Sequence, residues 1–237
     1  MEQPMITLRE EAKSAGIPLE DIQLQKFQIY SDTLIEWNEK INLTAITEPE
    51  KIAILHFLDS ILVLKEGKIP QNARLIDVGT GAGFPGVPLA IARPDLQLTL
   101  LDSLNKRLVF LKELCEQLEL PVQLIHSRAE EGGVKPELRE TFDIATARAV
   151  AALPVLCEYC LPFVKVGGYF LAMKGPNCEE EIKNSQKALQ VLGGKIEKQI
   201  NYSLPDGSGR TLLLIKKIAP TGAKYPRPSA KMAKNPL

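Results

Sequence analysis

A glycine-rich segment directly follows a short apolar run and precedes a helix-forming one. The apolar run is "ARLIDV", and four of the next eight residues, 79–86, are glycine. Two patterns overlap there, G-x-G-x-G over 79–83 and G-x-G-x-x-G over 81–86. Glycine permits positive φ and close approach of the backbone to a ligand, and N–H groups at a helix start attract polar or anionic groups. The segment therefore predicts a strand, a nucleoside-binding turn and a helix.

Short apolar runs alternate with longer helical segments downstream of residue 67. Alternation of this kind is typical of a parallel sheet covered by helices on both faces. Two closing strands, joined by "LPDGSG", are expected to form an antiparallel hairpin. The predicted fold class is α/β, Rossmann-like, with strands expected near 73–78, 96–102, 122–127, 142–148, 167–174, 196–203 and 210–217.

The first 66 residues have a different pattern and are expected to be helical. Apolar residues recur at helical spacing from about Glu20 to Ile41. The segments 7–10 and 47–50 match the capping box S/T-x-x-E and predict helix starts. We therefore expect three parts, which are a helical extension packed on the core (1–66), the core itself (67–218) and a C-terminal tail (219–237).

Composition is that of a globular protein. The chain has 237 residues, of which 45% are hydrophobic and 24% charged. No run approaches about 20 apolar residues, and the first residues do not resemble a secretion signal, so we expect no membrane association and a cytoplasmic location. Of the four cysteines only Cys157 and Cys160 are closely spaced. With no second pair they favour helix packing over a redox or zinc site, and no metal is expected.

Charge is unevenly distributed, although the formal net charge is zero. Residues 207–237 contain seven bases and no acid. Such a segment can bind phosphates, or it can be a solvated terminus, and charge alone does not decide between the two. We expect the last residues to be loosely ordered.

An acid at the end of the second expected strand completes a nucleoside site. Asp102 lies 23 residues after Gly79, where its carboxylate can accept hydrogen bonds from ribose hydroxyls. A dinucleotide and S-adenosylmethionine would both use this arrangement. Three features favour S-adenosylmethionine. Asp77 would repel a pyrophosphate but suits the ammonium group of a methionine moiety, the chain leaves no room for a separate substrate domain, and the closing hairpin is typical of methyltransferase sheets.

Several segments together resemble one protein family. They are "WNEKINLTAI", "HFLDSI", "LIDVGTGAGFPGVPLAIARPD", "LLDSLNKRLVFLKEL" and "HSRAEE". The resemblance is to the glucose-inhibited division protein B family, the small-subunit ribosomal RNA guanine-N7 methyltransferases, and it runs from about Trp37 to Leu214. It implies a class I S-adenosylmethionine-dependent methyltransferase fold. It also implies an enzyme whose substrate is a guanosine in the decoding-region loop of 16S rRNA.

The resemblance implies roles for individual residues. Gly79 and Phe84 would line the methionine side of the cofactor, Asp102 would bind the ribose, and Glu130 would flank the adenine. Arg148 would contact the cofactor near the methyl-transfer site. Together with the glycine pattern and the strand-end acid, the expected cofactor-binding set is Asp77, Gly79, Gly81, Gly83, Phe84, Asp102, Ser103, Leu104, Ala129, Glu130 and Arg148.

Methylation of guanine N7 demands little side-chain chemistry. N7 carries a lone pair and no proton, so the reaction needs orientation and exclusion of water rather than a general base. The sequence agrees, because "ARAV" follows the fourth expected strand in place of an Asn-Pro-Pro-Tyr type motif. We therefore expect no residue that acts as a chemical catalyst. Arg148 is the one candidate for a role at the reacting groups, by positioning them. It could hold a substrate phosphate, stack on the base, steady the cofactor carboxylate or form a structural ion pair.

Other polar residues are weaker candidates. His56, Asp59 and Ser60 fall within five residues on one expected helix, and without a G-x-S-x-G elbow they predict a local hydrogen-bonded cluster. The expected partner is 16S rRNA, in the small ribosomal subunit or an assembly intermediate, with a monomer favoured. The alternatives are a small-molecule methyltransferase, a nucleotide-dependent oxidoreductase and a non-enzymatic RNA-binding assembly factor. Candidate RNA contacts are Lys174, Arg210, Lys224 and Arg227.

Overall fold

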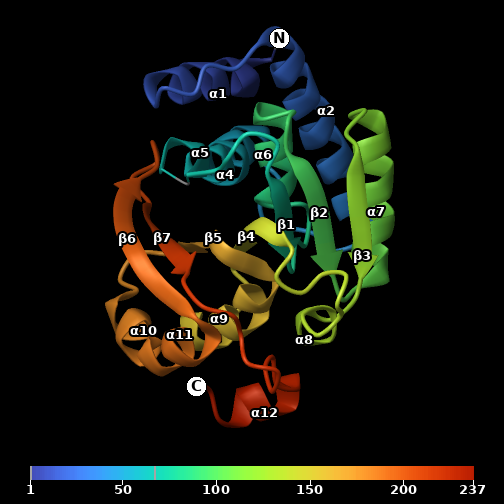
Figure 1. Cartoon of the computed structure of the whole chain (residues 1–237). Coiled ribbons are helices and arrows are strands. Elements are labelled where there is room, and N and C mark those ends of the chain that lie inside the picture. Colours follow the sequence, from blue (N-terminus) through green and yellow to red (C-terminus); the bar gives the residue numbers. More distant parts are fainter. Residues whose placement is uncertain (1, 67) are drawn as a thin grey trace.

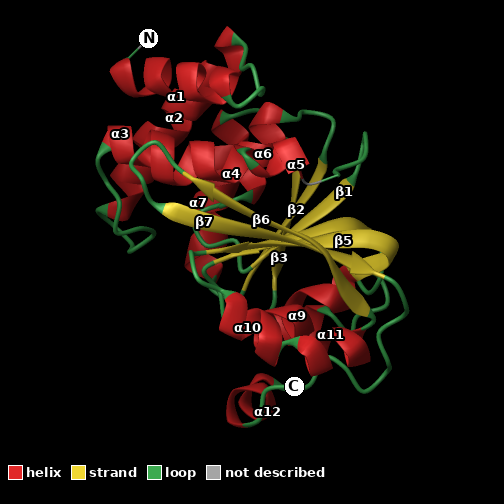
Figure 2. Ribbon diagram, turned by 90° about the vertical axis from the view of Figure 1, so that its left-hand side faces the viewer, coloured by secondary structure: helices red, strands yellow, loops and turns green. Residues whose placement is uncertain are grey.

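A single twisted sheet organises the molecule (Figures 1 and 2). The computed structural model describes residues 2–66 and 68–237, and in that part of the chain seven strands pair in the order β3-β2-β1-β4-β5-β7-β6. The first five strands run parallel, and β7 pairs antiparallel with both β5 and β6. This confirms the predicted fold class and hairpin. The strands are β1 (Arg74–Val78), β2 (Gln97–Asp102), β3 (Val122–His126), β4 (Phe142–Arg148), β5 (Val164–Lys174), β6 (Gly194–Ser203) and β7 (Gly209–Lys217).

Position in the sheet explains the strand sequences. The central strands β1 and β4 are covered on both faces, so their runs "RLIDV" and "FDIATAR" are almost continuously buried. The edge strands β3 and β6 are only partly covered, so half-buried and exposed side chains are mixed along both strands. Because β1 lies between β2 and β4, the direction of chain winding reverses beside β1. Ligands of open α/β sheets bind at such a point, outside the carboxyl ends of the strands.

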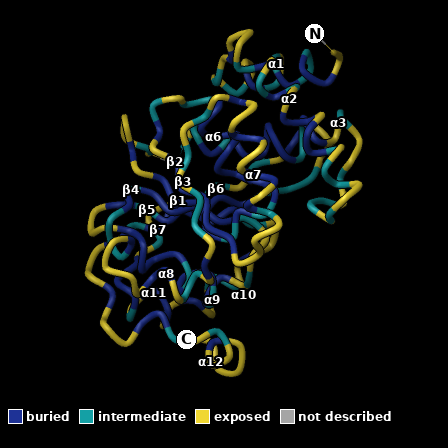
Figure 3. The backbone as a smooth tube through the Cα atoms, turned by 90° about the vertical axis from the view of Figure 1, so that its right-hand side faces the viewer, coloured by how far each residue is buried: buried dark blue, intermediate teal, exposed yellow. Residues whose placement is uncertain are grey.

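Helices cover both faces of the sheet (Figure 2). One face carries the N-terminal helices with α6 and α7, and the other carries α9, α10 and α11, with α12 beyond them. Buried apolar side chains form one cluster on each side. Figure 3 shows that the buried residues concentrate along the strands and on the helix faces turned towards them. The core helices are α6 (Gly86–Ala92), α7 (Asn105–Gln117), α8 (Ala129–Gly132), α9 (Leu153–Cys160), η2 (Leu161–Phe163), α10 (Glu179–Asn184), α11 (Gln186–Leu192) and α12 (Ser229–Lys234).

The N-terminal helices pack directly on the core. Tyr30 is fully buried, and its hydroxyl donates a 2.5 Å hydrogen bond to the carbonyl of Ala82 in the glycine-rich loop. The division of the chain into three parts stays a prediction. Met1, the first residue of the expected extension, and Gly67, the first residue of the expected core, lie outside the described residues. The N-terminal elements are α1 (Gln3–Ser14), α2 (Asp21–Asn38), α3 (Pro49–Lys51), the π-helix η1 (Ile52–Leu58), α4 (Asp59–Ile61) and α5 (Val63–Glu66).

The helix starts differ from the capping boxes that the sequence suggested. Helix α1 begins at Gln3, and Thr7 lies inside it with its hydroxyl donating to the Gln3 carbonyl at 3.2 Å. Helix α3 begins at Pro49 after Glu48, without a side-chain cap. The reciprocal capping box is instead formed by Glu20 and Gln23, at the start of α2. A glutamate in the N-cap position is why the S/T-x-x-E pattern missed it.

The C-terminal tail is ordered, contrary to the expectation of a loose end. It turns beneath α9 and ends in α12, whose Met232 is fully buried (Figure 1). Arg227 pairs with Glu158 of α9, with a shortest distance of 2.7 Å, and Glu158 is itself fully buried. Arg139 adds hydrogen bonds to the carbonyls of Thr221 and Tyr225. These partners lie far away along the chain, so local composition could not reveal them.

Loss of the Arg227 side chain is expected to destabilise the fold. The Arg227→Ala variant leaves the Glu158 carboxylate buried without its cation, which typically costs about 3 kcal/mol. Urea unfolding should show this loss, whereas the matched Lys234→Ala variant, at an exposed tail position, should change stability by less than about 0.5 kcal/mol. Equal stability of both variants would contradict a structural role for Arg227.

Candidate active site

The loop between β1 and α6 is held by its own backbone. The N–H groups of Gly79 and Thr80 both donate to the Leu101 carbonyl, at 2.9 and 3.1 Å, which ties the loop to β2. Positive φ occurs at all three glycines of the G-x-G-x-G pattern, with values of 69°, 61° and 100°. At Gly83 a Cβ atom would come within 2.5 Å of the Tyr30 hydroxyl. Glycine is therefore required here both by conformation and by close packing.

Asp77 organises this loop from beneath. It is fully buried, and its Oδ2 accepts hydrogen bonds from the Thr80 hydroxyl at 2.7 Å and the Gly86 N–H at 2.9 Å. Its Oδ1 accepts from the Thr146 hydroxyl at 3.2 Å, across the register of β1 with β4. Burial raises the pKa of Asp77 to about 6. All the hydrogen-bond partners of this carboxylate belong to the loop, α6 and β4, and its expected contact with a methionine ammonium group stays a prediction.

A cavity of about 330 Å³ lies at the carboxyl ends of β1, β2 and β4. The two acids that line it are Asp102 and Glu130, and the two cations are Arg107 and Arg128, so its charges balance. Tyr159 of α9 forms part of its wall, a contribution that the sequence analysis missed. The cavity brings together five of the expected cofactor residues, which are Gly79, Asp102, Ser103, Ala129 and Glu130.

The other expected cofactor residues lie behind this cavity or beside it. Gly81 and Leu104 act through their backbone, since both N–H groups donate to the Asp102 carboxylate at 2.9 Å. Gly83 and Phe84 are packed against the N-terminal helices. Gly81, Gly83, Phe84 and Leu104 do not line this cavity, and their expected cofactor-binding role stays a prediction.

Asp102 is oriented for a further hydrogen bond. Its carboxylate is 1% exposed and accepts the two N–H bonds from the loop and the following turn, with the Arg107 guanidinium at 3.3 Å. A carboxylate offers about four acceptor positions, so one remains for a ligand hydroxyl in the cavity. The free acceptor position suits a ribose hydroxyl, and the expected binding of ribose by Asp102 stays a prediction.

A second cavity of about 390 Å³ adjoins the first, and Ala149 lines both. Ala149 follows β4 with φ of 57°, and the strained turn separates the two spaces. Lys174 braces this turn, because its ammonium group lies 3.1 Å from the Ala151 carbonyl and 2.7 Å from Glu181. Glu181 also accepts from the Leu153 N–H at 2.7 Å. Lys174 thus has a positioning role that its sequence context did not suggest.

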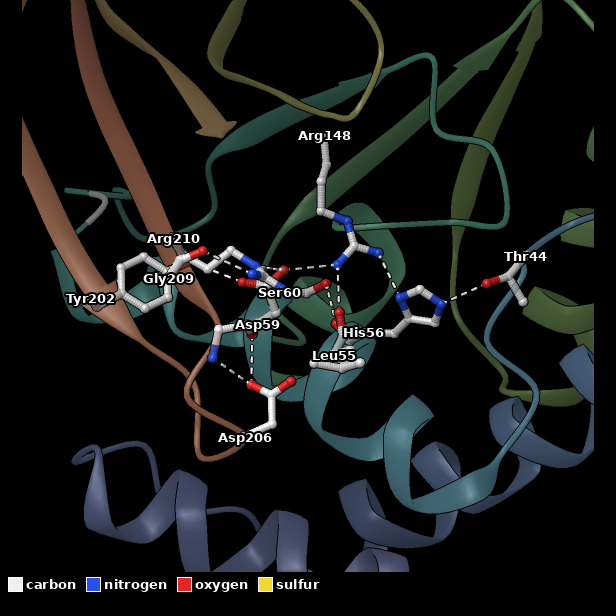
Figure 4. Close-up of polar contacts among 11 residues, drawn as sticks. Thr44, Leu55, His56, Asp59, Ser60, Arg148, Tyr202, Asp206, Gly209 and Arg210 are labelled. Carbon is white, nitrogen blue, oxygen red and sulfur yellow. Dashed lines mark hydrogen bonds and ion pairs between the residues drawn. The ribbon is translucent and has the colours of Figure 1, made fainter. Parts of the chain in front are cut away.

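Asp59 joins the side chains of the second cavity (Figure 4). It is 3% exposed, and its Oδ2 lies 3.1 Å from Nη1 of Arg148 and 3.4 Å from Nε of Arg210. The Tyr202 hydroxyl donates to its Oδ1 at 3.1 Å. The local cluster expected from the sequence is correct only for Ser60, which donates to the His56 carbonyl, because Asp59 pairs with residues distant in sequence.

His56 is held as a neutral imidazole. Its Nδ1 lies 3.1 Å from Nη2 of Arg148, and arginine only donates, so Nδ1 accepts and the proton resides on Nε2. Nε2 then donates to the Thr44 hydroxyl at 2.8 Å. Burial and the Arg148 charge lower the pKa of His56 to about 3. The ring also stacks on Phe84 at 4.4 Å, and Arg148 lies 4.9 Å from the Phe84 ring centre.

The remaining candidates divide into buried and exposed residues. Arg227 is a structural residue of the tail and no longer a candidate RNA contact. Lys224 is exposed, 5.3 Å from the Tyr225 ring.

Cys157 and Cys160 are free and buried, and burial raises the pKa of both thiols. Across residues 2–66 and 68–237, neither a metal-binding group of His, Cys, Asp or Glu side chains nor a bilayer-spanning helix occurs.

Comparison with known proteins identifies the family. The model of the rRNA small subunit methyltransferase G family matches residues 23–205. The chain is 55% identical to ribosomal RNA small subunit methyltransferase G of Acetivibrio thermocellus, over 97% of this chain and 95% of that one. It is 52% identical to the protein of that name from Alkaliphilus metalliredigens, over the full length of both. The chain belongs to this family.

Solved structures agree with this assignment at the level of the fold. A methyltransferase from Pyrococcus furiosus superposes with a TM-score of 0.58 at 16% identity, over 81% of this chain and 98% of that one. The M. jannaschii protein TYW2, solved in complex with AdoMet, superposes with a TM-score of 0.51 at 16% identity, over 64% and 72%. The chain is thus an S-adenosylmethionine-dependent methyltransferase of class I fold, and the oxidoreductase alternative is excluded.

Replacing Asp77 with asparagine is expected to change how stability depends on pH. The raised pKa means that the folded state favours protonated Asp77, so this carboxyl contributes stability below about pH 4 that is lost as the pH rises through about 6. Asparagine can serve the same three partners without a charge. Relative to the parent, Asp77→Asn should gain stability between pH 4.5 and 7, by on the order of 3 kcal/mol at most. Urea unfolding at both pH values tests this, and a constant difference would contradict it.

Proposed function

We propose that this protein transfers a methyl group from S-adenosylmethionine to N7 of a guanosine in the decoding-region loop of 16S rRNA. The substrate would be the small ribosomal subunit or an assembly intermediate, in the cytoplasm. Two adjoining cavities support the proposal, since one suits a nucleoside with balanced charges and the other offers excess positive charge. The relatives named above are methyltransferases of small-subunit ribosomal RNA, which also supports the proposal.

The first cavity has the donor and acceptor groups that the cofactor requires. Asp102 would accept from the ribose hydroxyls, while Ala129 and Glu130 would flank the adenine. Gly79 would lie along the methionine side, because it lines the same cavity next to the shared turn at Ala149. When bound, the cofactor supplies a methyl group activated by its sulfonium charge. The chain orients it towards the second cavity and keeps water away from it.

The second cavity favours N7 because its side chains cannot accept a proton. His56 Nδ1 already accepts from Arg148, and its lowered pKa makes it a very weak base. Asp59 is occupied by two guanidinium groups and a phenol. Methylation of an exocyclic amine or of N1 releases a proton that some group must take up. N7 methylation needs no such group, and this is the observation that most strongly supports the proposal.

The charge of the second cavity suits a nucleotide. Arg148 and Arg210 share the single carboxylate of Asp59, Lys174 is paired with Glu181, and His56 is neutral, which leaves one excess positive charge there. The excess of positive charge favours a phosphate group next to the acceptor base. A small-molecule methyltransferase remains the second candidate, although an uncharged acceptor would leave this charge without a partner.

Asp102→Ala is expected to weaken S-adenosylhomocysteine binding by at least tenfold. The substitution removes the ribose acceptor, and it also frees the Gly81 and Leu104 N–H groups that shape the loop. Isothermal titration calorimetry gives the dissociation constant directly. Glu116→Ala, at an exposed position on α7, is the control and should bind normally. Normal binding by Asp102→Ala would refute the assignment of the first cavity.

Methylated guanosine from treated subunits should carry its methyl group on N7. Small subunits from a strain that lacks this gene are incubated with the enzyme and tritiated S-adenosylmethionine, and the nucleosides are separated by chromatography. Label should coelute with N7-methylguanosine, and borohydride followed by aniline should cleave the RNA at one guanosine. Label on another position of the base would refute the N7 proposal, and transfer only to free small molecules would favour the second candidate.

A further inference from the structure

The loop between α2 and α3 places a hydroxyl group beside the second cavity. Asn38 ends α2, and its Oδ1 accepts hydrogen bonds from the N–H groups of Leu43 and Thr44, at 2.8 and 3.0 Å. The Thr44 hydroxyl accepts in turn from the N–H group of Ile46, a residue that lines this cavity, at 3.0 Å. Hydrogen bonds within the loop therefore fix the position of the Thr44 oxygen.

His56 links that hydroxyl to Arg148 (Figure 4). With its proton on Nε2, the ring donates to the Thr44 oxygen at 2.8 Å, and Nδ1 is left to accept from Nη2 of Arg148 at 3.1 Å. The other tautomer, or a charged ring, would direct an N–H group at the guanidinium group, which has no acceptor. Both ring nitrogens thus have a suitable partner in one protonation state, the neutral ring with the proton on Nε2.

The bond from His56 gives the guanidinium group of Arg148 its direction. Nη1 of Arg148 donates to the Leu55 carbonyl and to the Asp59 carboxylate, both at 3.1 Å, and Nη2 donates to His56. Two bonds at the same nitrogen leave the planar group able to turn about that nitrogen. A bond at a second nitrogen prevents the turn. His56 therefore sets the direction in which the rest of the guanidinium group points.

At least two of the five N–H groups of Arg148 remain for a ligand. Across residues 2–66 and 68–237, the side chain makes three hydrogen bonds to protein acceptors. It is 16% exposed and lines the second cavity, where positive charge is in excess. A phosphate oxygen binds best to donors that already point at it, because ordering a donor during binding costs affinity.

We propose that His56 is a positioning residue of the methyl-transfer reaction. It holds the plane of Arg148 so that the free N–H groups bind a phosphate oxygen of the acceptor nucleotide, and Thr44 keeps the imidazole in the tautomer that can do so. This inference rests on the proposed function, because it takes the second cavity as the acceptor site. It assigns a role in the reaction to a histidine that neither gives up nor takes up a proton.

Two amide substitutions of His56 test the acceptor atom. Asparagine can place its Oδ1 near the position of Nδ1, whereas the amide of glutamine lies one bond further out, near the position of Nε2. With the full-length enzyme and unmethylated small subunits, His56→Gln should lower kcat/KM for subunits at least about tenfold, from the loss of a hydrogen bond to a charged group. His56→Asn should stay within about threefold of wild type. Both variants should bind S-adenosylhomocysteine with wild-type affinity.

The hydroxyl of Thr44 has a matched control in the same loop. Thr44→Val removes the acceptor for Nε2–H and should lower kcat/KM for subunits about fivefold. Thr47→Val changes an exposed threonine outside the cavity and should leave kcat/KM at the wild-type value. Equal effects of the two substitutions would contradict the role of Thr44.

The tautomer can be measured without the reaction. The chain has two histidines, His56 and His126, so a long-range proton–nitrogen correlation spectrum of the imidazole rings is readily assigned with the His56→Asn variant. At neutral pH, wild-type His56 should be uncharged with its proton on Nε2. A proton on Nδ1, or a charged ring, would overturn the proposal even if the variants failed to fold.

Three outcomes of the kinetics separate this inference from its alternatives. Equal losses in His56→Gln and His56→Asn would mean that the ring acts through its stacking on Phe84, and the proposal would be wrong. Weaker S-adenosylhomocysteine binding with unchanged kcat/KM for subunits would place Arg148 at the cofactor and would also refute it. If the wild type methylates no guanosine, the proposed function fails first, whereas a wrong tautomer in an active wild type refutes this inference alone.

Discussion

The arrangement of side chains around the second cavity depends on the buried carboxylate of Asp59. It lies at the end of the π-helical segment, and it holds guanidinium groups from β4 and β7 and a phenol from β6. Those strands are brought together only by the completed sheet. A buried acid with two cations is stable because each charge has partners, whereas loss of the acid would leave the cations facing one another. The N-terminal helices therefore complete the site as well as covering the core.

A second buried acid, Asp77 near the end of β1, organises the glycine-rich loop beside the first cavity. Asp77 joins the loop, the start of α6 and β4 through three hydrogen bonds. Phe84 then projects from the same loop into the N-terminal helices, where its ring stacks with Tyr30 at 5.3 Å and His56 at 4.4 Å. Phe84, a residue of the glycine-rich loop, thus also supports His56, which lines the second cavity. The glycine loop and the acceptor cavity form one packed unit that meets the shared turn at Ala149.

The sequence predicted what is local and periodic. The run "FDIATAR" matches the observed β4, and the strand-end acid Asp102 lies in the cavity where the pattern put it. Contacts between distant segments could not be predicted in the same way. Nothing near Arg227 indicates that a glutamate on α9 will bury against it, and Asp59 resembled a helical neighbour of Ser60. The glycine pattern also could not show that Gly81 would act through its N–H on Asp102.

Counting charges along the sequence overstated the basic character of the tail. Of the seven bases in residues 207–237, Arg210 pairs with Asp59, Arg227 with Glu158, and the fully buried Lys217 lies 3.1 Å from Glu140. Cations held by buried acids add little to long-range attraction of RNA, which depends on unpaired surface charge. With a formal net charge of zero, the protein is poorly suited to general phosphate binding. The side chains around Asp59 are instead held in fixed positions by that carboxylate, which favours contacts of defined geometry over diffuse attraction.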